Sequence, residues 1–387
     1  MRTDAFPTDV YRRIEALLAS PTYGLDPDDH QERLLAVLQS QLAYATERNA
    51  QLERYVRAWP IDYRMASQIA DLPFLPVGAF KADPPLALVP RESITRTLAS
   101  SATTGQRPSR VALDAETSKR MVKGVTTIIR DFIGSKRRPY LVIDTPEALG
   151  GQMELGARGA AIQGLRPFAT EVVCCLRHGA SGTLEIDADK LRDFAFRWAQ
   201  ADVLVYGFTY VIWQHFVLAL RAKGVALDLP NARVLHSGGW KRLLDQAVTR
   251  EAYASGVAAV FGCAPTNVLD FYGMVENVGI VYPDCERGNK HVPAFGHVIV
   301  RDPLTLRPVE PGQQGLVQVC SALPTSFPGF LVLTDDIAEV IGADGCGCGR
   351  RGIHFRFVKR VPKTEMRGCG NLESARQRPA TFPVADG

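Results

Sequence analysis

Apolar residues recur at helical spacing in the first part of the chain and give way to short apolar runs further along. Residues 28–58 place apolar side chains three or four positions apart behind acidic start residues, a pattern that predicts a helix. The stretch 71–81, DLPFLPVGAFK, is divided by prolines and predicts a loop. We therefore expect residues 1–90 to form a helical N-terminal region.

Strand-like runs alternate with helical stretches from residue 91 to residue 278. The predicted strands are TRTLAS (95–100), SRVALD (109–114), YLVID (140–144), ADVLVYG (201–207), ARVLHSGG (232–239) and NVLDFYG (267–273). Helical periodicity lies between them, at 117–133, 187–200, 209–223 and 240–255. This alternation predicts an α/β core whose sheets are largely buried.

The pattern changes again after residue 278. Residues 279–358 contain the apolar runs VGIVY, GHVIVRD, GLVQVCSA, LVLTDDIAEVIG and HFRFVKR, separated by turns, and they predict a smaller β-subdomain. Residues 359–387 are mostly polar and predict a short C-terminal tail.

Composition excludes several classes of protein. A hydrophobic fraction of 46% with 22% charged residues is that of an ordinary globular protein. A net charge of +4 is too small to favour a nucleic-acid partner, and no apolar run reaches membrane-spanning length. The N-terminus lacks an apolar signal core, and eight cysteines in 387 residues then predict a reducing compartment, the cytoplasm.

A loop rich in hydroxyl groups follows the first predicted strand. The segment SSATTGQRPS (100–109) provides Ser100, Ser101, Thr103, Thr104 and Gly105. Backbone N–H groups and hydroxyls at this density suit a phosphate, although the spacing is not that of a Walker loop. A simple Ser/Thr turn between two strands is the alternative.

Two glycines follow the predicted strand at 232–237. In HSGGW, Gly238 and Gly239 after Ser237 would let a flat ring or a phosphate approach the backbone. The alternative is the entry turn of a helix that starts at this point.

A carboxylate follows the strand in DFYGMVEN (270–277). Ligands favour the carboxyl edge of a sheet, where Tyr272 would stack on a base and Glu276 would hold Mg²⁺ beside phosphates. A core strand with a tight exit is the alternative.

Two carboxylates, Asp335 and Asp336, lie inside the apolar run LTDDIAEV (333–340). Burying acids is costly unless they bind something, and a ribose diol is one ligand that would compensate Asp336. A β-turn is the alternative.

Four soft ligands are arranged in two clusters that suit a metal. Cys285 and His291 are followed by Cys346 and Cys348, a C-x5-H … C-x-C pattern. Tetrahedral zinc accepts three thiolates and one imidazole and leaves no position open for water, so this pattern predicts a structural Zn²⁺ site. Free thiols and imidazoles on turns are the alternative, and Cys263 is the other cysteine most able to substitute as a ligand.

In this order, the hydroxyl loop, the Tyr-Gly-x-x-Glu strand end and the later Asp resemble the motifs of the adenylate-forming superfamily. The chain resembles more closely the acyl-protein synthetases of bacterial bioluminescence (LuxE type), with phenylacetate-CoA ligases as more distant relatives. The segments that carry this closer resemblance span residues 70–370 and are LPFLPVGAFK, ARGAAIQGL, YGFTYVIW, LHSGGWKRL and EMRGCGN. The resemblance implies an adenylate-forming α/β core of layered sheets with a small β-subdomain, whose mobile C-terminal domain is missing or reduced. It also implies ATP and Mg²⁺ as cofactors. The C-x5-H … C-x-C spacing is similar to that of phenylacetate-CoA ligase-like proteins.

The resemblance assigns nucleotide-binding roles to further residues and reveals departures. Gly273 and Met274 lie within the Tyr-Gly-x-x-Glu motif, and Arg360 resembles the hinge arginine that reaches the ribose. Ala102 stands where the family loop usually has glycine, and Val275 stands where threonine is usual before the acid. The family's usual loop lysine is also replaced, and Arg107 is the substitute phosphate cation.

The resemblance implies an ATP-dependent enzyme that activates a carboxylic acid as acyl-AMP and passes the acyl group to a thiol. Cys369 in RGCGN matches the cysteine that accepts the acyl group in the bioluminescence synthetases, and nearby Lys363 and Arg367 favour its thiolate. The final acceptor would be a reductase or a carrier protein. One rival is a ligase that transfers directly to CoA or a carrier thiol. Another is a degenerate nucleotide-binding scaffold, which the departures at Ala102 and Val275 motivate.

The acid is expected to lie against YGFTYVIW. Phe208, Tyr210 and Trp213 would form apolar walls, which suit a fatty and an aryl acid equally. The oligomeric state cannot be predicted from these residues.

Overall fold

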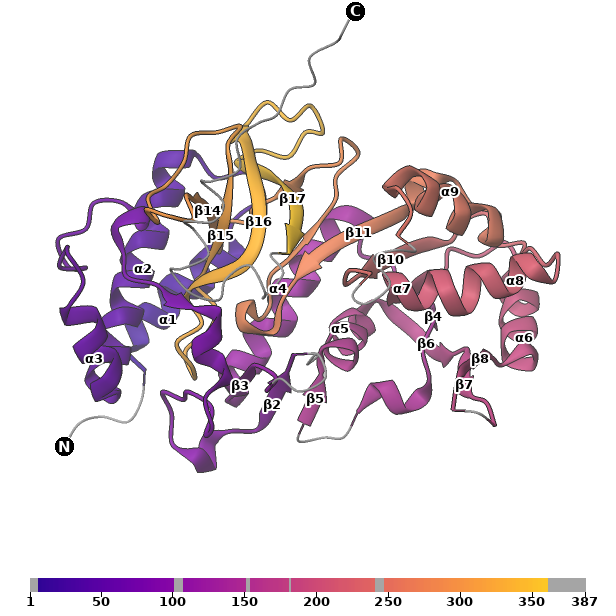
Figure 1. Ribbon diagram of the computed structural model, residues 1–387, viewed down its shortest axis with the longest axis horizontal. Helices are drawn as coiled ribbons and strands as arrows, with labels where there is room; N and C mark the ends of the chain where they lie inside the picture. Colours follow the sequence, from indigo (N-terminus) through magenta and orange to yellow (C-terminus); the bar gives the residue numbers. More distant parts are fainter. Residues whose placement is uncertain (1–5, 101–106, 151–153, 181, 241–246, 361–387) are drawn as a thin grey trace, which may run out of the picture.

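A mostly parallel sheet forms one half of the molecule, on the right in Figure 1. The computed structural model describes residues 6–100, 107–150, 154–180, 182–240 and 247–360. In spatial order the sheet contains β12 (Val281–Pro283), β11 (Val268–Gly273), β10 (Arg233–Ser237), β9 (Leu204–Phe208), β4 (Arg138–Val142) and β6 (Ala169–Cys174). All neighbours run parallel except β12, which is antiparallel to β11. Every residue of β4 and β9 is buried, as expected of strands covered on both faces.

The second large sheet of the molecule is mostly antiparallel. Its path is β13 (Lys290–His291), β17 (Ile353–Arg360), β16 (Leu331–Ala343), β15 (Gln314–Ser321) and β14 (Gly296–Arg301), and β1 (Leu75–Pro76) pairs with β16 in parallel. The predicted strands after residue 278 are therefore present, and the N-terminal loop contributes a short strand to their sheet.

Two small sheets complete the β structure of the described residues. One contains β3 (Arg110–Leu113), β2 (Arg96–Ala99) and β5 (Glu154–Gly156), and the other is the hairpin β7 (Leu176–His178) and β8 (Leu184–Ile186). In the first of these, β2 and β5 are parallel, so the hydroxyl loop after β2 and the residues after β5 leave the sheet at the same edge.

The helices begin at side-chain caps in most cases. Their bounds are α1 (Thr8–Ala19), α2 (Pro27–Arg48), α3 (Ala50–Arg57), α4 (Ala115–Ile133), α5 (Ala157–Leu165), α6 (Ala188–Trp198), α7 (Thr209–Val211), α8 (Leu218–Ala222) and α9 (Arg250–Phe261). Asp26, Asp114 and Thr249 accept backbone N–H bonds at the starts of α2, α4 and α9. A π-helical turn, Ile212–Val217, joins α7 to α8.

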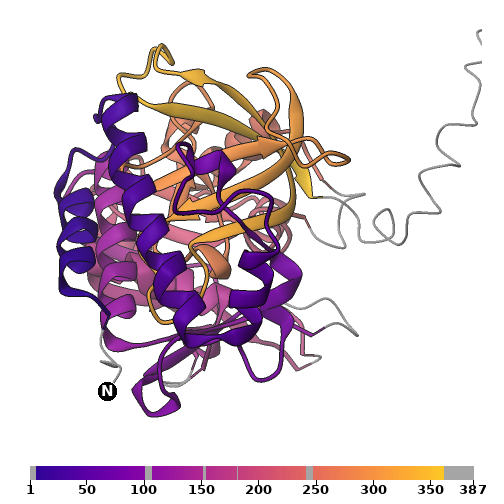
Figure 2. The same cartoon turned by 90° about the vertical axis from the view of Figure 1, so that its left-hand side faces the viewer.

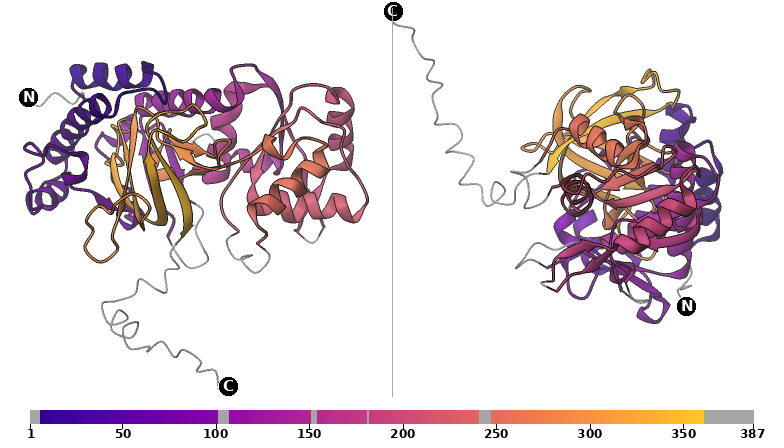
Figure 3. Two further views of the ribbon diagram at one scale, coloured as in Figure 1. Left: turned by 90° about the horizontal axis from the view of Figure 1, so that it is seen from above. Right: turned by 90° about the vertical axis from the view of Figure 1, so that its right-hand side faces the viewer.

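The helices divide between the two sheets. α1, α2 and α3 lie beside the antiparallel sheet, and the long α2 runs along it in Figure 2. α6, α8 and α9 lie at the opposite end with the parallel sheet, as Figure 3 shows from above. One buried cluster joins the N-terminal helices to β14–β17, whereas a second contains the parallel sheet with α5, α6, α8 and α9. The domain limits derived from the sequence remain a prediction.

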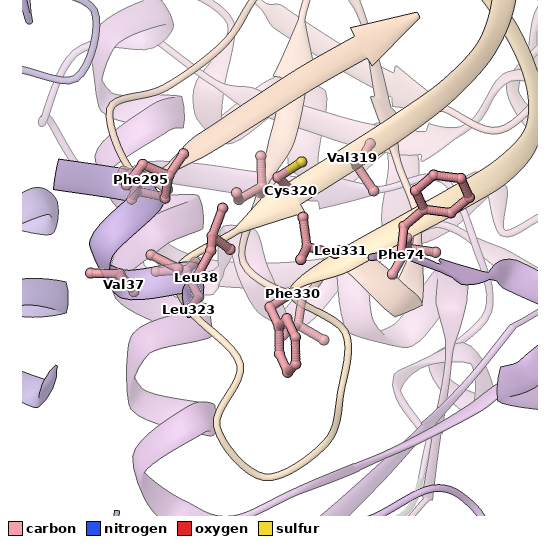
Figure 4. Packing of buried hydrophobic residues seen from close by; sticks show 14 of the residues in the cluster. Val37, Leu38, Phe74, Phe295, Val319, Cys320, Leu323, Phe330 and Leu331 are labelled. Carbon is pink, nitrogen blue, oxygen red and sulfur yellow. The ribbon is translucent and has the colours of Figure 1, made fainter. Parts of the chain in front are cut away.

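The N-terminal helices pack onto the antiparallel sheet through large apolar side chains. Figure 4 shows Leu38 of α2 near Cys320 of β15, Leu323 and Leu331 of β16, all of which are fully buried. A buried leucine side chain contributes roughly 1.5–3 kcal/mol by leaving water. The N-terminal region is therefore an integral part of the core that supports the antiparallel sheet.

The expectation of an α/β core is confirmed, with one correction to the helices. Of the helix predicted at 240–255, the described part becomes helical only at Arg250, because residues 247–249 are not helical and the extended Thr249 caps the helix. Gly238 and Gly239 themselves lie outside any helix. Within the described residues, no helix has both the length and the apolar character needed to cross a membrane.

Candidate functional site

The carboxyl ends of three parallel strands place most of the predicted nucleotide-binding residues at one edge. Ser237, the last residue of β10, pairs with Phe208 of β9 and with Phe271 of β11. The chain leaves all three strands just beyond this row. In parallel α/β sheets, ligands bind at such an edge.

Gly238 and Gly239 present exposed backbone directly after β10. Gly238 has a φ of +77°, and a Cβ added there would lie 3.3 Å from the ring of Phe208. The left-handed backbone and this tight contact explain why glycine occupies the position. The sequence predicts that a flat ring or a phosphate can approach the backbone here, and the exposed glycines leave that backbone accessible.

The hydroxyl loop is closed at its base by two hydrogen bonds. The N–H of Ser100 donates to the carbonyl oxygen of Ser109 at 2.9 Å, and the N–H of Ser109 donates to Oγ of Ser100 at 2.9 Å. The loop residues Ser101, Thr103, Thr104 and Gly105 lie outside the described residues. Arg107, the predicted phosphate cation, is exposed where the chain returns to β3.

Glu276 lies against the base of this loop. It belongs to a 3₁₀ turn (Val275–Asn277) after β11, is only 4% exposed, and lies within reach of the side chain of Ser109. Burial raises the pKa of Glu276 above its usual range, while the side chain of Ser109 and the charge of Arg360 oppose the rise. The structure thus brings the predicted magnesium ligand to the predicted phosphate loop.

Tyr272, Asp336 and Arg360 form a second polar group at the same edge. The phenol of Tyr272 donates to Oδ2 of Asp336 at 2.8 Å. The guanidinium of Arg360 donates to both carboxylate oxygens, at 2.7 and 3.2 Å, because the two residues pair across β16 and β17. A carboxylate offers about four acceptor positions, so Asp336 retains about one for a ligand hydroxyl.

Aromatic rings hold Tyr272 in place. Its ring stacks with Tyr282 and Phe357, at centroid distances of 5.9 and 5.2 Å. Burial raises the pKa of Tyr272 well above its usual range, so the phenol keeps the proton that it donates. Gly273 is exposed beyond it, and the sulfur of Met274 lies 3.8 Å from the Tyr272 oxygen.

The residues predicted to line the acid pocket lie on the other side of Gly238. Phe208 and Trp213 are buried and Tyr210 is partly buried. Trp213 sits in the π-helical turn and stacks on Tyr253 of α9 at 5.5 Å. A Cβ at Gly256 would lie 2.6 Å from its ring, so a glycine is required there.

A buried polar chain lies beneath these aromatic residues and was not found from the sequence. Nδ1 of His236 lies 3.0 Å from Oγ1 of Thr209 and 3.6 Å from Oδ1 of Asp270. Burial lowers the pKa of His236 to about 4, so the ring is neutral near pH 7. Lys290 continues the chain, with its ammonium 3.0 Å from both Asp270 and Asp284.

The four predicted metal ligands converge from two segments, the β12–β13 segment and the turn between β16 and β17. Their ligand atoms all lie within 4.8 Å of one another, with Sγ of Cys285 3.7 Å from Sγ of Cys346 and Sγ of Cys348 3.2 Å from Nε2 of His291. Tetrahedral zinc with bonds of about 2.3 Å separates two sulfurs by about 3.8 Å, so the spacing fits.

The surroundings of the sulfurs also fit a metal site. The amide of Asn289 donates to Sγ of Cys346 at 3.2 Å, and the N–H of Arg287 donates to Sγ of Cys285 at 3.4 Å. Such N–H···S bonds stabilise thiolate ligands. Gly345 and Gly347 have φ values of +70° and +75°, which allow the tight turn that carries Cys346.

The remaining cysteines differ from this group. Cys174, Cys175 and Cys320 are buried core residues, as predicted. Cys263 is partly buried and is not part of the cluster of metal-ligating atoms found among the described residues. Cys369 lies outside the described residues.

Comparisons of sequence identify relatives of the chain. Residues 14–377 match the family described as acyl-protein synthetase, LuxE. The long-chain-fatty-acid–luciferin-component ligase of Vibrio harveyi is 33% identical over 137 residues, which are 35% of this chain and 35% of that ligase. The ligase of the same name from Aliivibrio fischeri is 29% identical over 143 residues, 36% of each chain. Each match thus spans little more than a third of the relative.

Comparisons of structure identify the fold. 2-Hydroxyisobutyryl-CoA ligase with 2-HIB-AMP and CoA in its thioesterification state has a TM-score of 0.64 and 17% identity, covering 93% of this chain and 74% of that one. An open conformation of the same enzyme has a TM-score of 0.63 and 17% identity, covering 85% and 74%. The core therefore has the fold of the adenylate-forming ligases.

Proposed function

The chain belongs to the LuxE family of acyl-protein synthetases, and from that premise we propose that it activates a carboxylic acid with ATP. An oxygen of the acid attacks the α-phosphorus, the bond to the leaving pyrophosphate breaks, and acyl-AMP forms. The observation that supports this proposal most is the contact between Glu276 and Ser109 at the base of the hydroxyl loop. It joins a buried carboxylate to a phosphate-binding candidate at the edge where parallel sheets bind nucleotides.

The proposed roles follow from position. The hydroxyls of Ser100, Ser101, Thr103 and Thr104, with the backbone of Gly105 and the charge of Arg107, hold the phosphates. Glu276 would hold Mg²⁺, which when bound neutralises phosphate charge.

The nucleoside half of ATP lies along the ends of β10 and β11. The base lies against Ser237–Gly239 and Tyr272–Met274, where exposed glycine backbone gives it room. The ribose takes the remaining acceptor position of Asp336, with Arg360 beside it.

The acid is proposed to be a fatty acid, with an aryl acid as the alternative. The two curated relatives are named as long-chain-fatty-acid ligases, and Phe208 and Trp213 provide buried apolar surface behind Gly238. Pyrophosphate exchange into ATP, measured with fatty acids of several lengths and with aryl acids, tests this assignment. Exchange that depends on an acid supports the enzyme, and its absence with every acid would favour the scaffold suggested by Ala102 and Val275.

The acyl group is proposed to pass to Cys369. The thiolate attacks the carbonyl carbon of acyl-AMP, AMP leaves, and a thioester forms that a reductase or carrier protein then accepts. This step rests on the sequence, where Cys369 lies between two glycines and near Lys363 and Arg367. Direct transfer to CoA or a carrier thiol is the competing route.

The two routes differ in a label on the protein. With ATP and radiolabelled acid, we expect an acid-stable label that hydroxylamine removes from the wild type. Cys369→Ser should lose this label and keep pyrophosphate exchange. A Cys369→Ser protein that still carries the thioester and turns over normally would establish direct transfer instead.

A structural zinc ion is proposed at Cys285, His291, Cys346 and Cys348. The sulfur spacing and the N–H donors to two of the sulfurs support it. With four protein ligands the ion has no open position, so its part would be to join the β12–β13 segment to the turn between β16 and β17.

A further inference from the structure

A buried ion pair lies at the end of β4, outside the residues assigned above. Asp144 follows this strand, and its side chain is only 3% exposed. Its Oδ1 accepts the N–H of Thr145 at 2.8 Å, and its Oδ2 lies 3.4 Å from Nε of Arg158. Arg158 occupies the first turn of α5, in the segment ARGAAIQGL.

Arg158 is only partly committed to this pair. Its side chain is 36% exposed, and within the described residues its two terminal amino groups have no hydrogen-bonding partner. A guanidinium offers five donors in a planar fork that matches two oxygens of a phosphate or a carboxylate. Most of the N–H donors of Arg158 are therefore not used by Asp144.

The position of Arg158 relates it to the hydroxyl loop. Ala99 of β2 pairs with Gly156 of β5, so Ser100 begins the loop one residue after this pair and Arg158 follows two residues after it. Because β2 and β5 are parallel, both residues leave the sheet at the same edge.

The ion pair also acts on a tyrosine that lies beside the end of β10. Asp144 and Arg158 are both close enough to act electrostatically on the phenol of Tyr206. That phenol lies 2.8 Å from Oγ of Ser237, the residue before the two glycines. Arg158 is thus connected to two segments assigned to the nucleotide, to the hydroxyl loop through the β2–β5 pairing and to the end of β10 through Tyr206.

We propose that Arg158 is a substrate-binding residue of the activation reaction, contacting paired anionic oxygens, and that Asp144 is the positioning residue that orients it. The oxygens belong either to the phosphates of ATP or to the carboxylate of the acid, which present the same planar, negatively charged edge. The inference rests on the proposed function. A buried carboxylate that engages only one side of a guanidinium leaves the donors on the other side available to a ligand.

The test compares four variants in the pyrophosphate exchange assay. Arg158→Gln removes the charge, Arg158→Lys keeps it without the fork, and Asp144→Asn releases the arginine. Arg166→Gln removes an exposed charge just beyond the same helix and is the matched control. Loss of a charge-assisted bond predicts a KM about tenfold to a hundredfold higher for Arg158→Gln, with intermediate values for Arg158→Lys and Asp144→Asn.

The substrate whose KM rises identifies the ligand. A rise for ATP assigns the phosphates, and a rise for the acid assigns the carboxylate. Thermal melting checks that each variant is folded, and Arg158→Lys carries the test if Asp144→Asn is not. An Arg158→Gln enzyme with the KM and kcat of Arg166→Gln would overturn the proposal.

Calorimetry separates this inference from the proposed function. If the wild type shows no exchange with any acid, the proposed function fails, and binding of inorganic pyrophosphate and of ATP is then compared directly. Weaker binding of either by Arg158→Gln than by Arg166→Gln would still support an anion site, whereas equal binding of both would exclude it.

Discussion

The buried carboxyl of Glu276 makes the stability of the fold depend on pH. Because burial raises its folded pKa, the folded chain favours the protonated acid. As the pH rises above the usual range of a glutamate, the carboxyl must ionise inside the fold, and the free energy of unfolding falls. A bound cation would recover this cost, which is why a buried acid here suits a metal that arrives with its substrate.

Glu276→Gln should separate the two effects. The amide carries no charge, so we expect pyrophosphate exchange to fall by orders of magnitude while the Tm at neutral pH stays equal or rises. Exchange and calorimetric melting are measured on the same preparation, with the exposed Glu310→Gln as control. Undiminished exchange would remove Glu276 from the magnesium site.

Individual residues were found from the sequence only where a motif marks them. Glu276 could be identified because an aromatic residue, a glycine and an acid follow a strand. Ser109 and Arg158 could not, since each matters through a partner that is remote in the chain, Glu276 for the first and Asp144 for the second. Asp336 was identified, but its engagement by Tyr272 and Arg360 depends on a register that the sequence does not encode locally.

At the scale of elements, the proposed metal site would add a further link between two segments that the β13–β17 pairing and the Arg350–Glu286 ion pair already hold together. Removing the ion with a strong chelator should lower the Tm, because the two cysteine-bearing segments lose the metal bonds that add to their strand pairing. Cys346→Ser should do the same and reduce the metal content found by elemental analysis. Cys263→Ser, outside the cluster, should retain one metal per chain and the wild-type Tm. A metal-free native preparation of normal stability would refute the site.

Strands were easier to predict than their order. Each apolar run between 95 and 360 that was assigned as a strand is one, because short buried runs have a clear local signature. The insertion of β4 between β6 and β9, and the pairing of β1 with β16, depend on contacts across long stretches of chain. The start of α9 was misplaced because apolar spacing continues through 240–255, while Thr249 sets the cap.

For the whole molecule, three buried histidines make the free energy of unfolding depend on pH. Nε2 of His30 on α2 lies 2.9 Å from the carbonyl oxygen of Gly296, and its ring is 5.7 Å from His297 on β14. Burial lowers the pKa values of His30, of His297 to about 3 and of His236 to about 4. These groups are neutral in the fold and gain protons first when unfolded.

The contribution of these three histidines to stability should therefore be constant above the usual histidine pKa, near 6.5, and fall as the pH decreases from there toward 4. Melting temperatures across this range measure the slope. His297→Gln should make the slope shallower, because one buried imidazole no longer titrates, whereas the exposed His178→Gln should leave it unchanged. Equal slopes in all three proteins would exclude the His30–His297 contact as a cause.

The ion pair between Asp336 and Arg360 has a kinetic consequence. It fixes the end of β17 beside the nucleotide edge, and Cys369 follows Arg360 by nine residues, which span at most about 32 Å. A thiol on so short a tether has an effective concentration on the order of millimolar, so acylation should be first order within one chain. The rate constant of labelling should not change on tenfold dilution. A mixture of Glu276→Gln and Cys369→Ser chains, which separates the proposed activation and acceptor functions, should remain unlabelled, and labelling of the mixture would mean transfer between molecules.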